Sequence, residues 1–140
     1  MATRPVTVIR GADEPFWRAA REGRLVYQWC PGCRRAVFPG RIACPECLSP
    51  ALTWLTSTGR GTVYSYTVVR RTRHPYFAAR VPYVVALVDM AEGFRLLATL
   101  EAQPEAVAVG MPVRVRFEPL GEAFGMPVFR PDPDGAVGDP

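Results

Sequence analysis

The chain has 140 residues and a mass of 15.5 kDa, the size of one domain or of a small module joined to a modest one. Its hydrophobic content of 49% is sufficient for a buried core and excludes a disordered protein. The net charge is +4, and all 17 basic residues are arginines, whose planar guanidinium groups bind phosphates and carboxylates through paired hydrogen bonds.

The sequence shows no targeting or membrane segment. Residues 1–14 contain no continuous apolar run behind a basic start, so we expect no secretory signal. The longest apolar run, residues 81–88, has the length of a strand, whereas a membrane helix needs roughly 20 residues. We therefore expect a cytoplasmic protein with no membrane partner.

The N-terminal segment, residues 1–23, is predicted to form a loose arm and one short helix. Asp13 is placed as the N-cap, a proline suits the first turn, and a glycine follows the end. Phe16 and Trp17 give this helix a bulky aromatic face. A helix this short is not stable alone, so its aromatic side chains must pack against another surface.

From residue 24 the apolar pattern changes to a period of two, which is typical of strands. The pattern predicts that Leu25, Tyr27 and Trp29 share one face of the first strand. Two further strand-like pieces follow, the first of them ending at a Pro-Gly turn. We assign residues 24–56 to this segment.

All four cysteines lie in this segment as two Cys-x-x-Cys pairs separated by ten residues: Cys30, Cys33, Cys44 and Cys47. This spacing is typical of a tetrahedral metal site with four thiolate ligands. A disulfide would need an oxidising compartment, and a redox dithiol would need only one pair. Rubredoxin-type iron sites use similar loops, so zinc is the preferred metal and iron the alternative. Four protein ligands leave no open position, which predicts a structural role.

Residues 57–131 contain five strand-like segments with glycine turns and almost no helix, as in a small closed or partly closed barrel. In the first strand, alternation separates two faces, Val63, Ser65, Thr67 and Val69 on one and Tyr64, Tyr66 and Val68 on the other. Residues 132–140 are acidic and rich in Pro and Gly, which predicts a disordered tail.

No catalytic set stands out. The single histidine, His74, precedes a proline in an expected loop, and no cysteine lies outside the paired motifs. The sequence contains no Gly-x-Ser-x-Gly elbow, phosphate-binding loop or His-Glu-x-x-His motif. Activity as an independent enzyme is therefore the weaker hypothesis.

A binding function suits the residues better. No acid lies between Glu46 and Asp89, whereas five arginines do, interleaved with aromatic residues. Aromatic rings stack on bases and arginines hold phosphates, which suits single-stranded nucleic acid or an adenosine phosphate such as coenzyme A. Alternate aromatic residues on a strand are also commonly core. The pattern therefore indicates a surface rather than a particular ligand.

The order of the segments resembles a known family. The stretches are "PFWRAAREGRLVYQWCPGC", "FPGRIACPEC", "GRGTVYSYTVV" and "GMPVRVRFEP". They resemble the zinc-ribbon and OB-fold proteins associated with acyl-coenzyme A metabolism, long catalogued as a domain of unknown function. The likeness covers residues 14–131. It implies a mainly β fold with a short N-terminal helix, a rubredoxin-like zinc ribbon and a C-terminal five-stranded OB-fold barrel.

The resemblance also implies a function in complexes. Members accompany thiolase-fold enzymes, including thiolases, synthases and aldolases that shorten steroid side chains, and some are joined to hotdog-fold hydratases. The partner carries the catalytic residues, while the zinc-ribbon protein scaffolds it and helps form the coenzyme A channel. We therefore expect a non-catalytic subunit of a hetero-oligomer involved in lipid or steroid degradation. A single-stranded nucleic-acid-binding OB-fold protein is the alternative, which the modest net charge disfavours, and a rubredoxin-like electron carrier is a third possibility.

Carried onto this chain, the resemblance makes the four cysteines the ligands of a structural Zn²⁺. Phe16 and Trp17 are candidate partner contacts, the alternative being that they cap their own barrel. The acid-free basic stretch supplies the candidate contacts for the phosphates of a coenzyme A thioester shared with the partner: Arg70, Arg71, Arg73 and His74.

Overall fold

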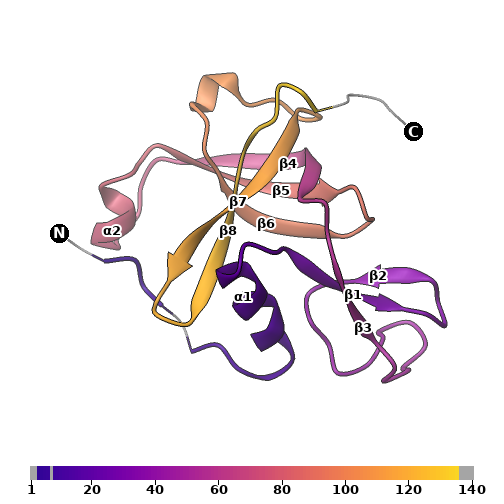
Figure 1. Ribbon diagram of the computed structural model, residues 1–140. Helices are drawn as coiled ribbons and strands as arrows, with labels where there is room; N and C mark the ends of the chain where they lie inside the picture. The colour runs from indigo at the N-terminus through magenta and orange to yellow at the C-terminus, as the bar shows by residue number, and fades with distance from the viewer. Residues whose placement is uncertain (1–2, 7, 136–140) are drawn as a thin grey trace.

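The computed structural model describes residues 3–6 and 8–135, and its elements follow in the predicted order (Figure 1). A 3-10 turn, η1 (Gly11–Asp13), leads into helix α1 (Glu14–Arg21). Asp13 is the N-cap residue as predicted, but its side chain does not cap the helix. Its Oδ1 instead accepts a hydrogen bond of 2.9 Å from the backbone N–H of Gly40, which ties the start of α1 to the cysteine-containing segment.

A three-stranded antiparallel sheet follows, made of β1 (Val26–Cys30), β2 (Arg35–Val37) and β3 (Thr53–Thr56) in the order β2-β1-β3. The central strand is buried on both faces, because Gln28 is buried as well as Tyr27. The period-two pattern predicted a strand here, and the burial of Gln28 adds that both faces of this strand are covered.

The side chain of Gln28 is buried without losing its hydrogen bonds. Its Oε1 accepts from the backbone N–H of Arg41 at 2.7 Å, and its Nε2 donates to the carbonyl of Arg41 at 3.0 Å. A buried amide is stable only when its polar atoms are paired in this way. This pair of bonds fastens β1 to the chain that enters the second cysteine pair.

Five strands form a closed barrel in the order β4-β5-β6-β8-β7, with β4 paired to β7. The strands are β4 (Arg60–Val69), β5 (Tyr83–Met90), β6 (Arg95–Leu100), β7 (Pro112–Leu120) and β8 (Phe124–Pro131). Neighbours are antiparallel except β6 and β8, which meet in parallel at Leu100 and Phe129. The predicted mainly β fold with a five-stranded barrel is confirmed.

A bulge at Tyr64 in β4 reverses the predicted faces of this strand. Before the bulge, Val63 pairs with Val88 and both side chains are buried. Beyond it the register shifts by one residue, so that Tyr66 and Val68 pair with fully buried positions of β5. One inserted residue moves every later side chain to the opposite face. The prediction that alternate residues from Val63 onward share one face is therefore wrong beyond the bulge.

The loops of the barrel contain two short helical pieces. Helix α2 (Pro75–Ala78) lies between β4 and β5, and the 3-10 turn η2 (Pro104–Ala106) lies between β6 and β7. In Figure 1, α2 and the start of the chain lie at the same end of the barrel. No helix in the described part of the chain is long and apolar enough to cross a bilayer.

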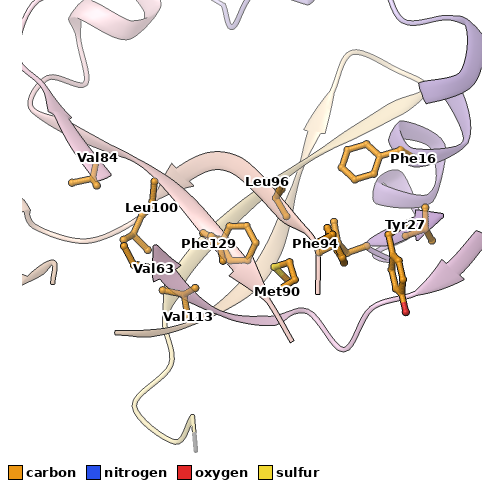
Figure 2. Close-up of a cluster of buried hydrophobic side chains, with 14 of the residues drawn as sticks. Phe16, Tyr27, Val63, Val84, Met90, Phe94, Leu96, Leu100, Val113 and Phe129 are labelled. Atoms are coloured by element: carbon orange, nitrogen blue, oxygen red, sulfur yellow. The ribbon is translucent and has the colours of Figure 1, made fainter. Parts of the chain in front are cut away.

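One hydrophobic core joins α1, the three-stranded sheet and the barrel. Figure 2 shows Phe94 at the junction, with Phe16 and Tyr27 on one side and Phe129 of the barrel on the other. The rings of Tyr27 and Phe94 stack with centroids 4.8 Å apart, and Phe38 packs against both Phe94 (5.2 Å) and Phe16 (5.3 Å). Aromatic pairs at these separations contribute beyond the area that they bury.

The linker between sheet and barrel is fixed by Glu92 in the β5–β6 turn. Its carboxylate accepts from the hydroxyl of Ser57 at 2.6 Å and from the backbone N–H of Thr58 at 2.7 Å. Hydrogen bonds to a charged acceptor are the stronger kind. The two parts of the chain are thus held together by polar contacts as well as by the shared core.

The predicted tail begins with an ordered turn rather than with disorder. Asp132 is only 7% exposed, and its Oδ2 lies 3.4 Å from Nε of Arg114. Its backbone N–H donates to the carbonyl of Pro112, and its own carbonyl accepts from Gly135, both at 2.9 Å. These contacts correct the prediction for residues 132–135, while residues 136–140 lie outside the described residues.

Candidate metal centre and docking surface

The two cysteine pairs form matching turns. The backbone N–H of Arg34 donates to the carbonyl of Cys30 at 2.7 Å, and that of Leu48 donates to Cys44 at 2.8 Å. Arg34 and Leu48 both have a left-handed backbone, with φ of 55° and 63°. Each turn therefore brings its two sulfur atoms to the same side of the chain.

The sulfur atoms are placed as a metal cage requires. All four Sγ atoms lie within 4.8 Å of one another, with Cys30 and Cys47 at 3.6 Å and Cys33 and Cys44 at 3.8 Å. Zinc–sulfur bonds of about 2.3 Å in a tetrahedron would put the sulfur atoms about 3.8 Å apart. A disulfide would need about 2.05 Å, so neither pair is bonded. The four cysteines are therefore arranged to bind one metal ion through four thiolates.

Backbone N–H groups favour thiolates at this centre. Hydrogen bonds from the N–H groups of Cys47 and Glu46 lower the pKa of the Cys44 thiol to about 7. Hydrogen bonding with Cys47, and after it burial, raises the pKa of Cys33 to about 12, and repulsion from a thiolate at Cys30 adds to this rise. A divalent cation removes that repulsion and deprotonates the thiols.

The centre is closed on its inner side and joined directly to the sheet. Cys30 and Cys44 are fully buried, whereas Cys47 is exposed. Cys30 is the last residue of β1, so an ion bound here would hold the central strand to the second turn. Four protein ligands leave no position for water or substrate, so the arrangement can act as a structural pin.

The two aromatic residues of α1 have different environments. Phe16 is only 4% exposed and packs on Phe38 of this same chain, so it offers almost no surface to another protein. Phe16 therefore follows the alternative reading and packs in the core of its own chain, because a short helix needs a core, although it also forms part of the wall of the groove described next. Trp17 is half-buried and stays a candidate contact.

Trp17 borders an apolar groove that the three parts of the fold build together. The groove has a volume of about 250 Å³ and is lined by Trp17 of α1, Phe38 of the ribbon, and Leu97 and Met126 of the barrel, among others. Leu97 is 65% exposed. Only one residue of the lining, Asp13, is charged. Such a surface exists only while ribbon, helix and barrel keep their relative positions.

The four candidate phosphate contacts lie together on the β4–β5 loop. Three of them are exposed arginines, and Arg71, Thr72 and Arg73 border a hollow of about 460 Å³. His74 caps α2, because its Nδ1 accepts from the backbone N–H of Tyr76 at 3.1 Å. An accepting Nδ1 places the proton of the neutral ring on Nε2, which remains a hydrogen-bond donor.

Two tyrosine rings are already covered by guanidinium groups. Arg80 lies 3.5 Å from the ring centroid of Tyr76, and Arg4 lies 5.2 Å from the same ring. Arg95 lies 3.5 Å from the centroid of Tyr64. Cation–π contacts of this kind occupy the ring faces that stacked bases would need.

The residues that hold the ribbon together and join it to the barrel were not predicted from the sequence. Gln28 and Glu92 are polar residues whose partners are backbone groups distant in the sequence, so no local pattern marks them. Phe38 and Phe94 did carry a signal, since each is a large apolar residue beside a turn. Burial of such residues against each other can be inferred only from the tertiary arrangement.

A four-cysteine ribbon followed by a closed five-stranded OB barrel defines a class of two-part zinc-ribbon and OB-fold proteins. A family model described as "ChsH2, rubredoxin-like zinc ribbon domain" matches residues 17–53, and "ChsH2, C-terminal OB-fold domain" matches residues 54–118. The chain belongs to this family, whose members include DUF35 domain-containing scaffold proteins. The resemblance noted in the sequence is thereby confirmed.

Named relatives include scaffold and enzyme subunits. The "DUF35 domain-containing scaffold protein" of Methanothermobacter thermautotrophicus is 35% identical over 95 residues, which cover 66% of this chain and 71% of the relative. The "Probable enoyl-CoA hydratase alpha subunit" of Thermomonospora curvata is 39% identical over 132 residues, or 93% of this chain. This chain spans only 40% of that relative's length.

A solved structure shares the whole architecture. The "Ltp2-ChsH2(DUF35) aldolase" matches with a TM-score of 0.80 and 37% sequence identity. The match covers 91% of this chain and 98% of the compared chain. The similarity therefore includes the ribbon, the helix and the barrel.

Proposed function

We propose that this chain is an accessory, scaffolding subunit of an acyl-CoA enzyme complex. Its partner would be a thiolase-fold enzyme of the thiolase or aldolase type that carries the catalytic residues. The observation that carries the proposal is the groove beside Trp17, which depends on three parts of the fold held together by a four-cysteine centre and a shared aromatic core. Similarity to an aldolase complex and to a hydratase subunit supports the kind of partner.

A hotdog-fold hydratase is proposed as a second partner, since the hydratase relative is longer than this chain. The cytoplasmic location stays a prediction. Members that serve steroid side-chain aldolases suggest a steroid or other lipid acyl group as the substrate, and the partner enzyme would select it.

We also propose that the β4–β5 loop contributes to the coenzyme A channel. Arg70, Arg71 and Arg73 are exposed on one loop, where their guanidinium groups can pair with phosphate oxygens. Nε2 of His74 supplies a further donor beside them. The thioester would then lie between this chain and its partner.

Binding of single-stranded nucleic acid is the competing function. Two of the tyrosine rings that could stack on bases, Tyr76 and Tyr64, are covered by Arg80 and Arg95, which supports the acyl-CoA proposal instead. Oligonucleotide binding by the isolated chain that weakens steeply with salt would favour the competing function.

Affinity purification from the native host tests the scaffold proposal. An acyl-CoA enzyme of thiolase fold should co-purify in a fixed ratio with this chain. Catalysis should depend on residues of that enzyme, and this chain alone should show no activity. A control variant with Cys30→Ser and Cys44→Ser should lose the partner. The proposal fails if the isolated chain turns over an acyl-CoA, or if no acyl-CoA enzyme accompanies it.

Coenzyme A titration of the purified complex tests the loop. Replacing Arg71 and Arg73 together with alanine should weaken binding by about 10- to 100-fold, the equivalent of losing a charge-assisted contact. Arg21→Ala, at an exposed arginine at the end of α1, is the matched control and should leave the affinity for coenzyme A unchanged. Unchanged affinity in the loop variant would remove these arginines from the channel.

A further inference from the structure

The two cysteine turns have the same backbone conformation at the residue after the second cysteine, but the side chain at that position differs. The residue after each pair has a left-handed backbone, Arg34 with φ of 55° and Leu48 with φ of 63°. Glycine adopts this conformation freely, whereas any residue with a Cβ is strained in it. A glycine would therefore be the unstrained choice at both positions.

Leucine at position 48 serves neither the core nor the metal. Its side chain is 76% exposed, and the ligand sulfur atoms come from its neighbours. Ile42, two residues before Cys44, is 86% exposed. Single exposed aliphatic residues are ordinary on protein surfaces. Here two such residues lie near one turn, and one of them has a strained backbone. This combination indicates a contact with another molecule.

Ile42 and Leu48 lie on two chain segments that meet at the second turn. The backbone N–H of Cys44 donates to the carbonyl of Ser49 at 2.9 Å, so the chain that enters the turn lies beside the chain that leaves it. An ion on the four sulfur atoms would hold these segments in place. An anchor that is already fixed loses little conformational entropy when it binds.

The charge beside Ile42 and Leu48 indicates what they meet. Arg41, the residue before Ile42, is exposed, and its guanidinium makes no ion pair with the residues that the structure describes. Glu46 within the turn is already paired with Arg35 at 3.2 Å. The surface is therefore apolar with one free positive charge, and its complement is an apolar pocket with a carboxylate at its edge.

We propose that Ile42 and Leu48 form an apolar anchor that inserts into such a pocket on the acyl-CoA enzyme partner, an inference that rests on the proposed function. A second copy of this chain is the weaker occupant. The one acid that lines this chain's own apolar groove, Asp13, already accepts a hydrogen bond from Gly40, so a second copy offers no free carboxylate beside that groove.

Matched glycine variants test the anchor against the enzyme that co-purifies with the wild-type chain. Leu48→Gly and Arg34→Gly relieve the same kind of backbone strain, so both should keep the bound metal and a melting temperature no lower than that of the wild type. Leu48→Gly should weaken binding of the enzyme by about 10- to 100-fold, the equivalent of burying one aliphatic side chain. Arg34→Gly should stay within about threefold.

Ile42→Ser gives a second test that leaves the left-handed position untouched, and it should also weaken binding by about 10-fold. Equal affinity of the wild type, Leu48→Gly and Ile42→Ser overturns the anchor and leaves the proposed function standing. If the isolated wild-type chain self-associates and these variants do not, the anchor binds a second copy of the chain, which would overturn the enzyme as its occupant. If no acyl-CoA enzyme binds the wild type, the proposed function and the anchor both fail.

Discussion

At the scale of single residues, Gly125 sets how closely α1 approaches the barrel. A Cβ added there would lie 2.5 Å from the carbonyl carbon and oxygen of Ala20, which are backbone atoms and cannot turn aside. We expect Gly125→Ala to lower the free energy of unfolding by roughly 1–3 kcal/mol, as overpacking does. Urea unfolding would measure it.

Gly32 is the matched control for that substitution. A Cβ at Gly32 would meet sulfur atoms only at 3.9 Å, and its backbone is not left-handed. Gly32→Ala should therefore change the free energy of unfolding by under about 0.5 kcal/mol. Equal effects of the two substitutions would contradict the close approach of α1 to β8.

The ion pair between Glu101 and Arg116 predicts a pH dependence. Hydrogen bonds from Arg116 hold the pKa of Glu101 below its ordinary value. A carboxyl whose pKa is lower in the folded than in the unfolded state stabilises the fold at neutral pH, and this contribution is lost as the pH falls through the folded pKa. The side chains of Arg116 and Glu101 are 35% and 39% exposed, so solvent screens the pair and its contribution is under about 1 kcal/mol.

Comparison of the wild type with Glu101→Gln would measure this contribution. The wild type should be the more stable at pH 7, and the difference should shrink as the pH falls from about 6 to about 3. A difference that does not change with pH would show that the ionised carboxylate is not its source.

Individual residues were predictable where the spacing itself carries the chemistry. The positions of Cys30 and Cys44 in paired motifs were enough to predict one four-sulfur cluster, because tight turns leave the sulfur atoms few other arrangements. The sequence left Phe16 open between a partner and its own barrel, since an amphipathic helix has the same pattern whether its apolar face meets its own barrel or another chain. Leu48 carried no signal, because a left-handed backbone cannot be inferred from a leucine.

At the scale of elements, α1 depends on Phe16 for its place. Phe16→Ala should cost about 3–5 kcal/mol in unfolding free energy, as expected for a buried aromatic side chain. Trp17→Ala should cost less, ~1–2 kcal/mol, because Trp17 is half-buried. If Trp17 is a partner contact, its variant should also weaken partner binding by more than its loss of stability explains.

Thermal unfolding and partner binding of the two variants separate the two functions of the helix. Greater loss of stability in Trp17→Ala than in Phe16→Ala would contradict the packing described here. Normal partner binding by a folded Trp17→Ala chain would remove Trp17 from the docking surface.

The strands were predictable because period-two patterns and glycine turns are local signals, and all five barrel strands were found. Their faces were less predictable. The bulge at Tyr64 shifts the register without any mark in the sequence, since Tyr and Ser both occur in regular strands. Helix α2 was missed for a related reason, because its single turn rests on a side-chain cap by His74.

At the scale of the whole molecule, ribbon and barrel share one core, which the two family models divide at residues 53 and 54. The order of the segments predicted both parts and the family. The relative position of ribbon and barrel follows from the contacts of Phe38, Phe94 and Glu92. These contacts join residues of different segments, so the sequence pattern of one segment alone does not predict them. The predicted division at residues 23, 56 and 131 stays a prediction.

The central claim is that a metal ion pins the ribbon so that ribbon, helix and barrel present one docking surface to a catalytic partner. A chelator titration of the purified chain, with zinc content and binding of the co-purified acyl-CoA enzyme measured on the same samples, tests it most directly. The account predicts one zinc ion per chain and a loss of enzyme binding in step with the loss of zinc. A metal-free chain that stays folded and binds the enzyme as tightly as the untreated chain would contradict it.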